Sequence, residues 1–235
     1  MSTVNNKPFK NGYDISTEVE EEVEILDTRV YEPIGKFKFF YYITQLLVHC
    51  LLVGMLINIW RGPYFFLLWH PTFVTIGVYL YIQGILQVQW TENNKRRLKG
   101  ARIHSILNGL ATVCIMIAFI IIEINKASMG RPHFTSTHGQ FGLVIFILIW
   151  IAALAGTISL YIPGVFGGRA KAKRVYAPHR ILGYLLVAFM LINICLGVFT
   201  AYGLGTFEHH WVIVACIIVL YISLMLTCDI KKVRI

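Results

Sequence analysis

The sequence predicts an all-α membrane protein with six transmembrane helices. Of its 235 residues, 57% are apolar and only 14% are charged, whereas about 25% of the residues of a typical soluble domain are charged. Six apolar runs are long enough to cross a hydrocarbon core of about 30 Å, which takes about 20 helical residues. Because backbone groups cannot stay unpaired in lipid, each run is expected to be a helix.

Polar or aromatic residues separate these six runs. Trp60 and Arg61 end the first run, and His70 and Pro71 open the second, where proline is tolerated because a first-turn N–H has no helical partner. Basic segments follow the second and fourth runs, and His210 opens the sixth. The predicted spans are residues 38–60, 68–90, 102–124, 138–161, 180–203 and 210–228.

Basic residues predict the orientation of the spans. Segments 91–102 and 163–180 each carry five Lys or Arg residues, and the C-terminal KKVRI carries three more. The alternate connections hold only Arg61, Lys126 and Arg131. Because basic residues accumulate on the cytosolic side, both termini are expected to face the cytosol.

The ends of the chain and its cysteines exclude several classes. Residues 1–36 contain eight acidic residues, which is unlike a cleavable signal peptide and predicts a disordered cytosolic tail. Residues 37–229 form the predicted membrane domain, and 230–235 a basic cytosolic end. The net charge of +9 is explained by orientation, so no nucleic-acid binding is expected. Five cysteines, all at apolar runs, make a disulfide framework improbable, and no C-x-x-C-H motif exists for c-type haem.

Four histidines open the second to fifth spans at regular intervals. His104 follows His70 by 34 residues, His138 follows His104 by 34, and His179 comes 41 residues later. Spans two and four enter from the non-cytosolic side, whereas spans three and five enter from the cytosol. The sequence therefore predicts one pair, His70 and His138, near the non-cytosolic face and a second, His104 and His179, near the cytosolic face.

The two histidine pairs indicate a metal cofactor. An intramembrane histidine is costly without a partner, although a single one can simply bond a neighbouring helix. Zinc wants four protein ligands, and two histidines per level with no nearby carboxylate or thiolate fall short. Haem iron needs only two axial ligands, so the pattern favours two b-type haems per chain, each held by one pair.

Glycines near the histidines fit the same interpretation. Gly142 and Gly183 each follow a histidine by four residues and share its helical face, where a flat macrocycle can approach the backbone. Close helix packing is the alternative reason for the remaining glycines. These are Gly77, Gly84, Gly156 and Gly197.

The stretches LLWHPTF, ARIHSILNG, HFTSTHGQFG and PHRILGYLL together resemble the cytochrome b561 family, in particular its short six-helix transmembrane reductases. The resemblance covers about residues 38–228. It implies a central four-helix bundle of spans two to five holding two haems, with spans two and four sharing one and spans three and five sharing the other. It also implies cytosolic ascorbate as a one-electron donor, with monodehydroascorbate or ferric iron chelates as the acceptor opposite.

Basic residues before two of the histidines are candidates for binding the anionic donor, although they also serve as the orientation signal. Arg97 lies seven residues before His104, where ascorbate-binding members of the family carry a basic residue, but Ala101 departs from the basic residue found there in those relatives. The full candidate set is Lys95, Arg96, Arg97, Lys99 and Arg102 before His104, with Lys171, Lys173 and Arg174 before His179.

On the acceptor side, His133 resembles the family's non-cytosolic histidine, where an imidazole can steer an anionic radical or manage a proton. Arg131 is expected to share that role. His49, His209 and His210 have no assigned partner, so interfacial or helix-bonding roles are expected for them.

A transporter or structural membrane protein is the competing interpretation, with the histidines binding a permeating metal or proton. It predicts acidic residues facing the bundle interior, and only Glu123 and Asp229 come close. Dimerisation through the first or sixth span is compatible with the sequence. So is residence in an endomembrane, such as the endoplasmic reticulum or a vesicle, or in the plasma membrane.

Overall fold

The computed structural model describes residues 37–89 and 94–228, with side chains described from 38 to 89 and from 97 to 228. The predicted tails, 1–36 and 230–235, lie outside these residues. The side chains of Lys95 and Arg96 and all of Asp229 lie outside them as well.

All the regular secondary structure of the described residues is helical and none of it is strand, which confirms the all-α prediction. Short helices connect the long ones: η1 (Phe66–Leu68), η2 (Pro163–Phe166), α6 (Arg169–Ala172), η3 (Lys173–Val175) and α8 (Ala201–Thr206). The long helices are α2 (Phe37–Trp60), α3 (Trp69–Gln87), α4 (Asn94–Ser128), α5 (Thr137–Tyr161), α7 (Tyr176–Val198) and α9 (His210–Thr227).

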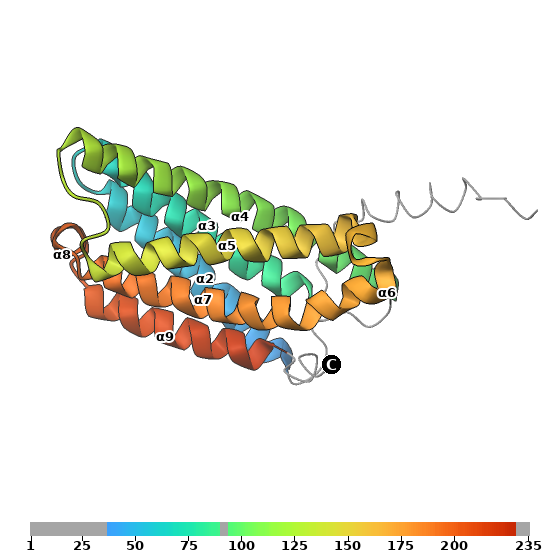
Figure 1. The fold of residues 1–235 in the computed structure, drawn as a ribbon. Helices are drawn as coiled ribbons and strands as arrows, with labels where there is room; N and C mark the ends of the chain where they lie inside the picture. The colour runs from blue at the N-terminus through green and yellow to red at the C-terminus, as the bar shows by residue number, and fades with distance from the viewer. Residues whose placement is uncertain (1–36, 90–93, 229–235) are drawn as a thin grey trace, which may run out of the picture. The chain divides into compact units, whose positions relative to one another are not determined.

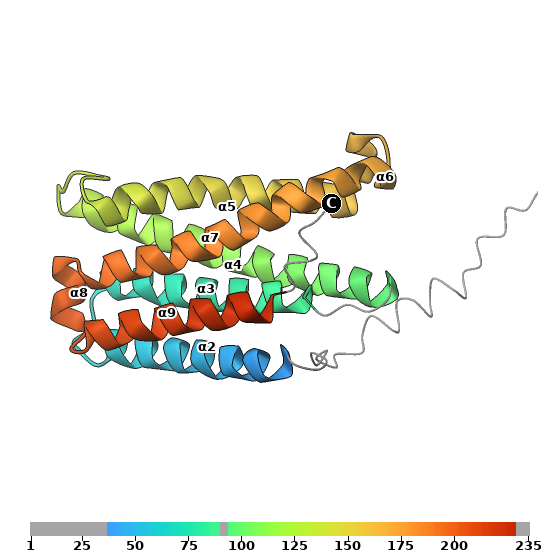
Figure 2. The same cartoon turned by 90° about the horizontal axis from the view of Figure 1, so that it is seen from below.

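The long helices run side by side (Figure 1). Two antiparallel hairpins, α3 with α4 and α5 with α7, lie against each other through contacts of α4 with α5 and of α3 with α7. Helices α2 and α9 pair with each other and cover α3 and α7, as the turned view shows (Figure 2). The four helices that carry the predicted histidine ligands are therefore neighbours.

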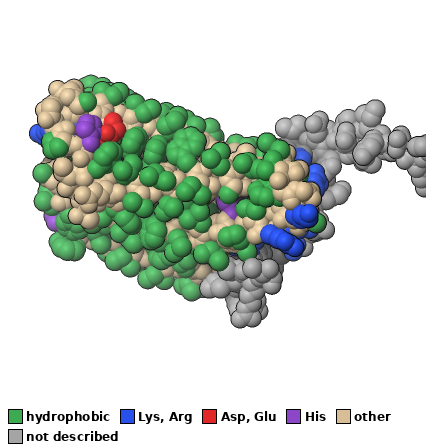
Figure 3. Space-filling model, viewed as in Figure 1, with side chains coloured by type: hydrophobic (Ala, Val, Ile, Leu, Met, Phe, Trp, Pro, Cys, Tyr) green, Lys and Arg blue, Asp and Glu red, His purple; other side chains and the backbone are tan. Residues whose placement is uncertain are grey.

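Five of the six long helices are long and apolar enough to cross a membrane: α2, α4, α5, α7 and α9. Helix α3 has 19 residues but is more polar, because it carries Thr72, Thr75 and Gln83. Its position explains this composition, since α2, α4 and α7 all contact it and Thr72 and Thr75 are buried. Hydrophobic side chains cover the length of the visible face in Figure 3, which fits an integral multi-pass membrane protein.

The third predicted span begins earlier than expected. Segment 91–102 was expected to be a loop, but α4 begins at Asn94 and runs for 35 residues, so His104 lies three turns inside it and not in its first turn. Lys and Arg are good helix formers and no proline interrupts 94–128, so the helix continues past the apolar run. His70 and His138 are second residues of their helices and His179 is the fourth of its helix, as predicted.

The fifth span ends earlier than predicted. Helix α7 stops at Val198, five residues short of the expected end. Thr200 then caps the separate helix α8 by accepting a hydrogen bond from the Gly203 N–H at 3.1 Å. The chain thus turns before residue 203.

Buried hydroxyls and amides tie the helices together. Thr44 Oγ1 of α2 lies 2.8 Å from Ser223 Oγ and 3.1 Å from Thr227 Oγ1 of α9. Tyr81 of α3 bonds Thr112 of α4 at 2.7 Å. Hydrogen bonds between helices contribute to association in lipid, where the hydrophobic effect does not drive it.

Candidate functional site

The structure brings the four histidines together as two separate pairs. The ring centroids of His70 on α3 and His138 on α5 lie 6.4 Å apart. Those of His104 on α4 and His179 on α7 lie 6.2 Å apart. The ring planes are 85° apart in both pairs. Each pair therefore joins one hairpin to the other.

Backbone carbonyls fix the tautomer of three of these rings. Nδ1 lies 2.9 Å from the Ala118 carbonyl in His70, 2.9 Å from the Gly84 carbonyl in His104 and 3.0 Å from the Asn193 carbonyl in His138. Because a carbonyl can only accept, Nδ1 carries the proton and Nε2 keeps a lone pair, which is how metal-binding histidines are oriented.

His179 departs slightly from this pattern. Its Nδ1 lies next to the carbonyl of Ala152, but the contact lacks the geometry of a hydrogen bond and this nitrogen has no hydrogen-bond partner. The ring is thus the least tightly oriented of the four.

A constant offset relates the four histidines to their carbonyls. Gly84, Ala118, Ala152 and Asn193 each lie 14 residues after the histidine on their own helix. Each helix therefore carries a paired histidine at one level and, at the other, the carbonyl that lies beside the histidine of its antiparallel partner. At 1.5 Å per residue, the two levels are about 21 Å apart.

The spacing within each pair fits one metal ion between two imidazoles. With metal–nitrogen bonds of about 2 Å, two rings on opposite sides of an ion have centroids about 6 Å apart. Among the described residues, no group of three or more His, Cys, Asp or Glu side chains is placed to hold a metal. The arrangement thus suits an ion whose other ligands come from a macrocycle, as in haem.

Glycines lie directly against two of the rings. A Cβ on Gly156 of α5 would lie 2.8 Å from His179 Cε1, and one on Gly197 of α7 would lie 3.1 Å from His138 Cε1. From the sequence, close helix packing was the alternative to a macrocycle contact for both glycines. They follow His138 and His179 on their own helices by 18 residues, which is five full turns. That spacing was the signal that could have identified them.

The two glycines predicted to face a macrocycle differ in their surroundings. A Cβ on Gly142 would lie 3.1 Å from Asn193 Nδ2. Apart from the nearby backbone of its own helix and its chain neighbours, no described atom lies within 4 Å of the Cβ position of Gly183. Gly183 therefore leaves the backbone approachable by a flat group, whereas Gly142 makes room for an amide.

A buried asparagine, Asn108 or Asn193, lies beside each histidine pair, and neither was predicted from the sequence. Asn108 Nδ2 lies 3.3 Å from His104 Nε2, and the Asn193 carbonyl is the one bonded to His138. Both amides have a buried Oδ1 without a hydrogen-bond partner. Because buried polar atoms are normally paired, these atoms are consistent with a further polar group beside each pair.

The candidate donor residues gather at one end of the bundle. Lys and Arg side chains cluster at the end that carries α6 in Figure 3. Arg97, Lys173 and Arg174 are exposed, Arg102 is half-buried and Lys99 is buried. The lengthening of α4 and the short helices before α7 bring the two basic segments to this same end.

At the opposite end, His133 pairs with an acid. Its Nδ1 forms an ion pair with the Glu123 carboxylate of α4 when the ring is protonated. Arg131 is exposed in the same connection. The pairing places Glu123 at the end of the bundle and not between the histidine pairs, which disfavours the transporter interpretation.

The unassigned histidines have local roles. His49 Nδ1 lies 2.6 Å from the Gln45 carbonyl, and its Nε2 lies 3.0 Å from the Tyr79 hydroxyl of α3. It therefore bonds two helices together, as expected. His210 packs beside Phe199 and Trp211.

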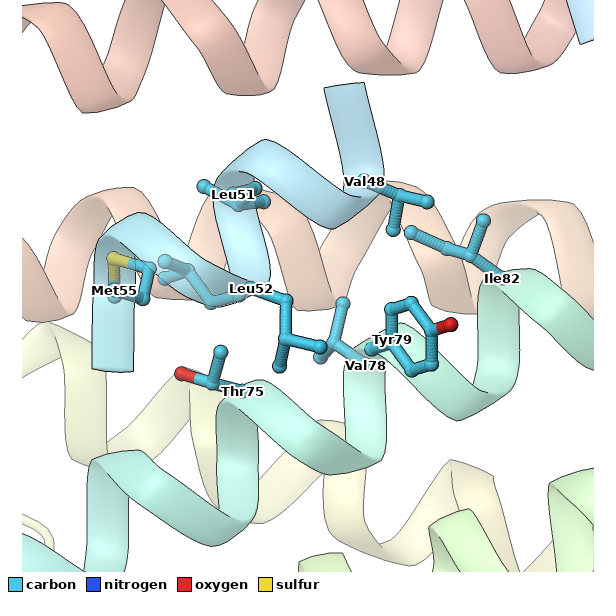
Figure 4. Close-up of a pocket in the computed structure, with 9 residues that line it drawn as sticks. Val48, Leu51, Leu52, Met55, Thr75, Val78, Tyr79 and Ile82 are labelled. Carbon is cyan, nitrogen blue, oxygen red and sulfur yellow. The ribbon is translucent and has the colours of Figure 1, made fainter. Parts of the chain in front are cut away.

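A shallow pocket between α2, α3 and α7 contains no histidine of either pair (Figure 4). Its polar atoms are already used, since Thr75 Oγ1 donates to the Pro71 carbonyl and the Tyr79 hydroxyl contacts His49. The other lining residues are Val48, Leu51, Leu52, Met55, Val78, Ile82 and Ile194. We therefore assign the pocket no chemistry.

Comparison with known families agrees with this site. Residues 69–204 match the family model described as eukaryotic cytochrome b561. The chain belongs to the cytochrome b561 family. Membership implies haem b binding, and the matched segment contains all four paired histidines.

Individual relatives support the same family. The chain is 28% identical to the transmembrane reductase CYB561D2 of Homo sapiens and 29% identical to that of Bos taurus, each over 141 residues, or 57% of this chain. It is 24% identical over 139 residues, 55% of this chain, to a Caenorhabditis elegans protein named putative transmembrane ascorbate-dependent reductase CYB561 homolog. The matches span 63% of the mammalian relatives and 51% of the nematode one.

Proposed function

We propose that this protein transfers single electrons across a membrane, from cytosolic ascorbate to monodehydroascorbate or a ferric iron chelate on the other side. The observation that carries the proposal is the presence of two histidine pairs with centroid separations of 6.4 and 6.2 Å, about 21 Å apart along the helices. The chain would then bind two b-type haems.

Each histidine pair would hold one haem through its two imidazoles. His70 and His138 would hold one, and His104 and His179 the other. When bound, the haem iron supplies reversible one-electron chemistry, and two axial imidazoles leave no open position for oxygen. The Nδ1–H bonds to backbone carbonyls keep Nε2 aimed at the ion.

The basic end of the bundle is the proposed donor site. Ascorbate is an anion at neutral pH, and exposed cations raise its local concentration and its rate of encounter. Arg97, Lys173 and Arg174 are exposed at this end, and Arg102, five residues after Arg97, is half-buried. Lys95 and Lys99 belong to the same segment. Ala101 offers no charge, so the arginines and lysines of both segments would share the binding.

The proposed orientation puts both termini and the basic end in the cytosol. Helix α3 would be the sixth span, held among its neighbours. A membrane potential contributes about 2.3 kcal/mol per charge per 100 mV and favours electrons leaving a negative cytosol. His133 and Arg131 would lie on the acceptor side. Dimerisation through α2 or α9 stays a prediction.

Haem stoichiometry and ascorbate kinetics test the proposal. Purified protein should contain two haems per chain with low-spin spectra, and both should be reduced by ascorbate. Vesicles loaded with ascorbate should reduce a ferric chelate outside them. One haem per chain, or no electron transfer across the vesicle membrane, would contradict the proposal.

Arg97→Ala tests the donor site. We expect stopped-flow reduction by ascorbate to slow by roughly tenfold, because an encounter-steering cation is lost. Arg61→Ala, at the other end of the bundle, is the matched control and should leave this rate unchanged. Equal rates in Arg97→Ala and native protein would remove Arg97 from the donor site.

A further inference from the structure

The connection between α4 and α5 is held firmly to both helices. Phe134 adopts a left-handed backbone conformation, φ 52°, which is uncommon for a residue with a side chain. Its ring stacks on Phe119 of α4 at 6.2 Å, and Phe119 stacks on Phe146 of α5 at 4.3 Å. The surrounding contacts thus fix His133, the residue immediately before Phe134.

Glu123 fixes the other side of His133. Glu123 and Phe119 lie four residues apart on α4 and therefore share one helical face, which meets this connection. The Glu123 carboxylate pairs with His133 Nδ1, and the side chains are 26% and 38% exposed. Nε2 has no hydrogen-bond partner among the described side chains. The pair therefore leaves one ring nitrogen available at a surface that solvent reaches.

The Glu123–His133 pair lies close to the pair formed by His70 and His138, called the outer pair from here on, whereas His104 and His179 form the inner pair. The Ala118 carbonyl of α4 is bonded to His70, and Glu123 is five residues, or about 7.5 Å of helix, further toward the end. Ser136 caps α5 by accepting from the Gly139 N–H at 3.1 Å, and the second residue of that helix is His138. The short connection between α4 and α5 thus links Glu123 to His138.

The charges around this pair suit an anionic acceptor. Lys126 of α4 is near enough to act electrostatically on both His70 and His138. Arg131 belongs to the same connection as His133, and its N–H donates to the Lys126 carbonyl at 3.0 Å. Between Glu123 and His138, the charged or titratable residues other than these two are therefore Lys126, Arg131 and His133.

We propose that Glu123 is a positioning residue of the acceptor site, which holds His133 by Nδ1 so that Nε2–H donates a proton to the acceptor as it is reduced. This inference rests on the proposed function. The monodehydroascorbate radical anion takes one electron supplied through the protein and one proton from His133. An acceptor O–H bond forms, the His133 N–H bond breaks, and the product is the ascorbate monoanion. The neutral imidazole then regains a proton from water.

Glutamate suits this position better than a neutral residue would. A carboxylate compensates the charge of the protonated imidazole, and it accepts the Nδ1–H bond in both protonation states of the ring. Glutamine keeps the size and an acceptor oxygen but not the charge. Glu123→Gln therefore removes the charge that supports proton donation but keeps the size of the side chain that anchors the segment.

The experiment compares two acceptors in the haem-loaded full chain. The haems are first reduced with ascorbate and then mixed in a stopped-flow instrument with monodehydroascorbate or with ferricyanide, which accepts an electron without a proton. In Glu123→Gln we expect the maximal rate with monodehydroascorbate to fall at least about tenfold, since general acid catalysis contributes about 10²-fold or more. Its KM and the ferricyanide rate should change little. The solvent deuterium isotope effect on the rate with monodehydroascorbate should be smaller in Glu123→Gln than in the native protein.

Controls keep the outcomes distinguishable. Glu123→Asp should recover part of the rate, and Glu208→Gln, which removes another acid near the same end, should behave as native. Equal losses with both acceptors, or no loss with either, would overturn the inference. Failure of ascorbate to reduce the haems of the native protein would instead contradict the proposed function. If Glu123→Gln loses haem, Glu123→Asp gives the same comparison.

Discussion

The two histidine pairs share one geometry but lie in different surroundings. Centroid separations of 6.4 and 6.2 Å and equal ring angles show that the spacing for an ion is the same at both levels. Exposed cations such as Arg97 and Lys173 dominate the end near His104 and His179. Acid–base pairs, Glu123 with His133 and Glu208 with Arg61, mark the other end. The geometry of the histidine pair is therefore repeated at both levels, and the two levels differ in the charged groups at the nearest end of the bundle.

Orientation of the rings adds a second difference. Both histidines of the outer pair donate Nδ1–H to carbonyls, at 2.9 and 3.0 Å. In the inner pair only His104 does so, and its ring also contacts the Asn108 amide. Because such bonds raise the basicity of a metal-binding imidazole, the two proposed haems would have different reduction potentials.

Removing ligands one level at a time should have the largest effect. His104→Ala should reduce the haem content from two to one per chain and lower the rate of reduction by ascorbate about 10²-fold or more. His70→Ala should also leave one haem, but that haem should still be reduced rapidly while transfer across vesicles stops. Haem assays and stopped-flow spectroscopy measure both results.

His49→Ala is the matched control for these variants, since His49 bonds two helices outside both pairs. It should retain two haems. Identical kinetics in His104→Ala and His70→Ala would break the assignment of the two levels to opposite sides.

Glycine substitutions should have intermediate effects that differ between the levels. Alanine at 156 would place Cβ 2.8 Å from the His179 ring, and at 197 it would lie 3.1 Å from the His138 ring. Overpacking of this kind costs about 1–3 kcal/mol. We expect Gly156→Ala to lower the melting temperature and the haem content more than Gly197→Ala does.

Gly54→Ala on α2 is the control, because no described atom lies within 4 Å of its Cβ position. It should leave the haem spectrum unchanged. A larger effect at 197 than at 156 would contradict the ring contacts described above.

The smallest effect concerns the ion pair between Arg61 and Glu208, at the end of the bundle opposite the basic cluster. Arg61 lies 3.1 Å from Glu208, and its hydrogen bond, then its charge, lowers the pKa of that exposed carboxyl from 4.5. A carboxyl with a lowered folded-state pKa stabilises the protein above its unfolded pKa, and the stabilisation is lost as pH falls through the folded pKa. Glu208→Gln should lower the melting temperature by only about 1 °C at pH 7.

That difference should disappear at acidic pH, once the carboxyl is protonated, and it should shrink in high salt because both side chains are exposed. Calorimetry of the two proteins between pH 3 and pH 7 measures it. A difference that grows as pH falls would show that Arg61 is not the partner that matters.

Much of this organisation was predictable from the sequence. The 34-residue intervals locate three of the four paired histidines, and helix length places the pairs at opposite levels. The start of α4 was not predicted, because a basic segment without proline continues a helix as readily as it forms a loop. The contact between Glu123 and His133 could not be predicted, since it depends on the left-handed turn at Phe134. The ring contacts of Gly156 and Gly197 depend on interhelical packing, which spacing alone only suggests.

Because of the 14-residue offset, the axial position of each helix sets the geometry of both histidine pairs at once. Sliding α4 along its axis would move His104 away from His179 and withdraw the Ala118 carbonyl from His70 in the same movement. Insertions in the connecting segments leave this register intact, whereas one extra residue between His104 and Ala118 would misalign both histidine pairs together. The separation of the two histidine pairs is therefore set by helical pitch and does not depend on loop length.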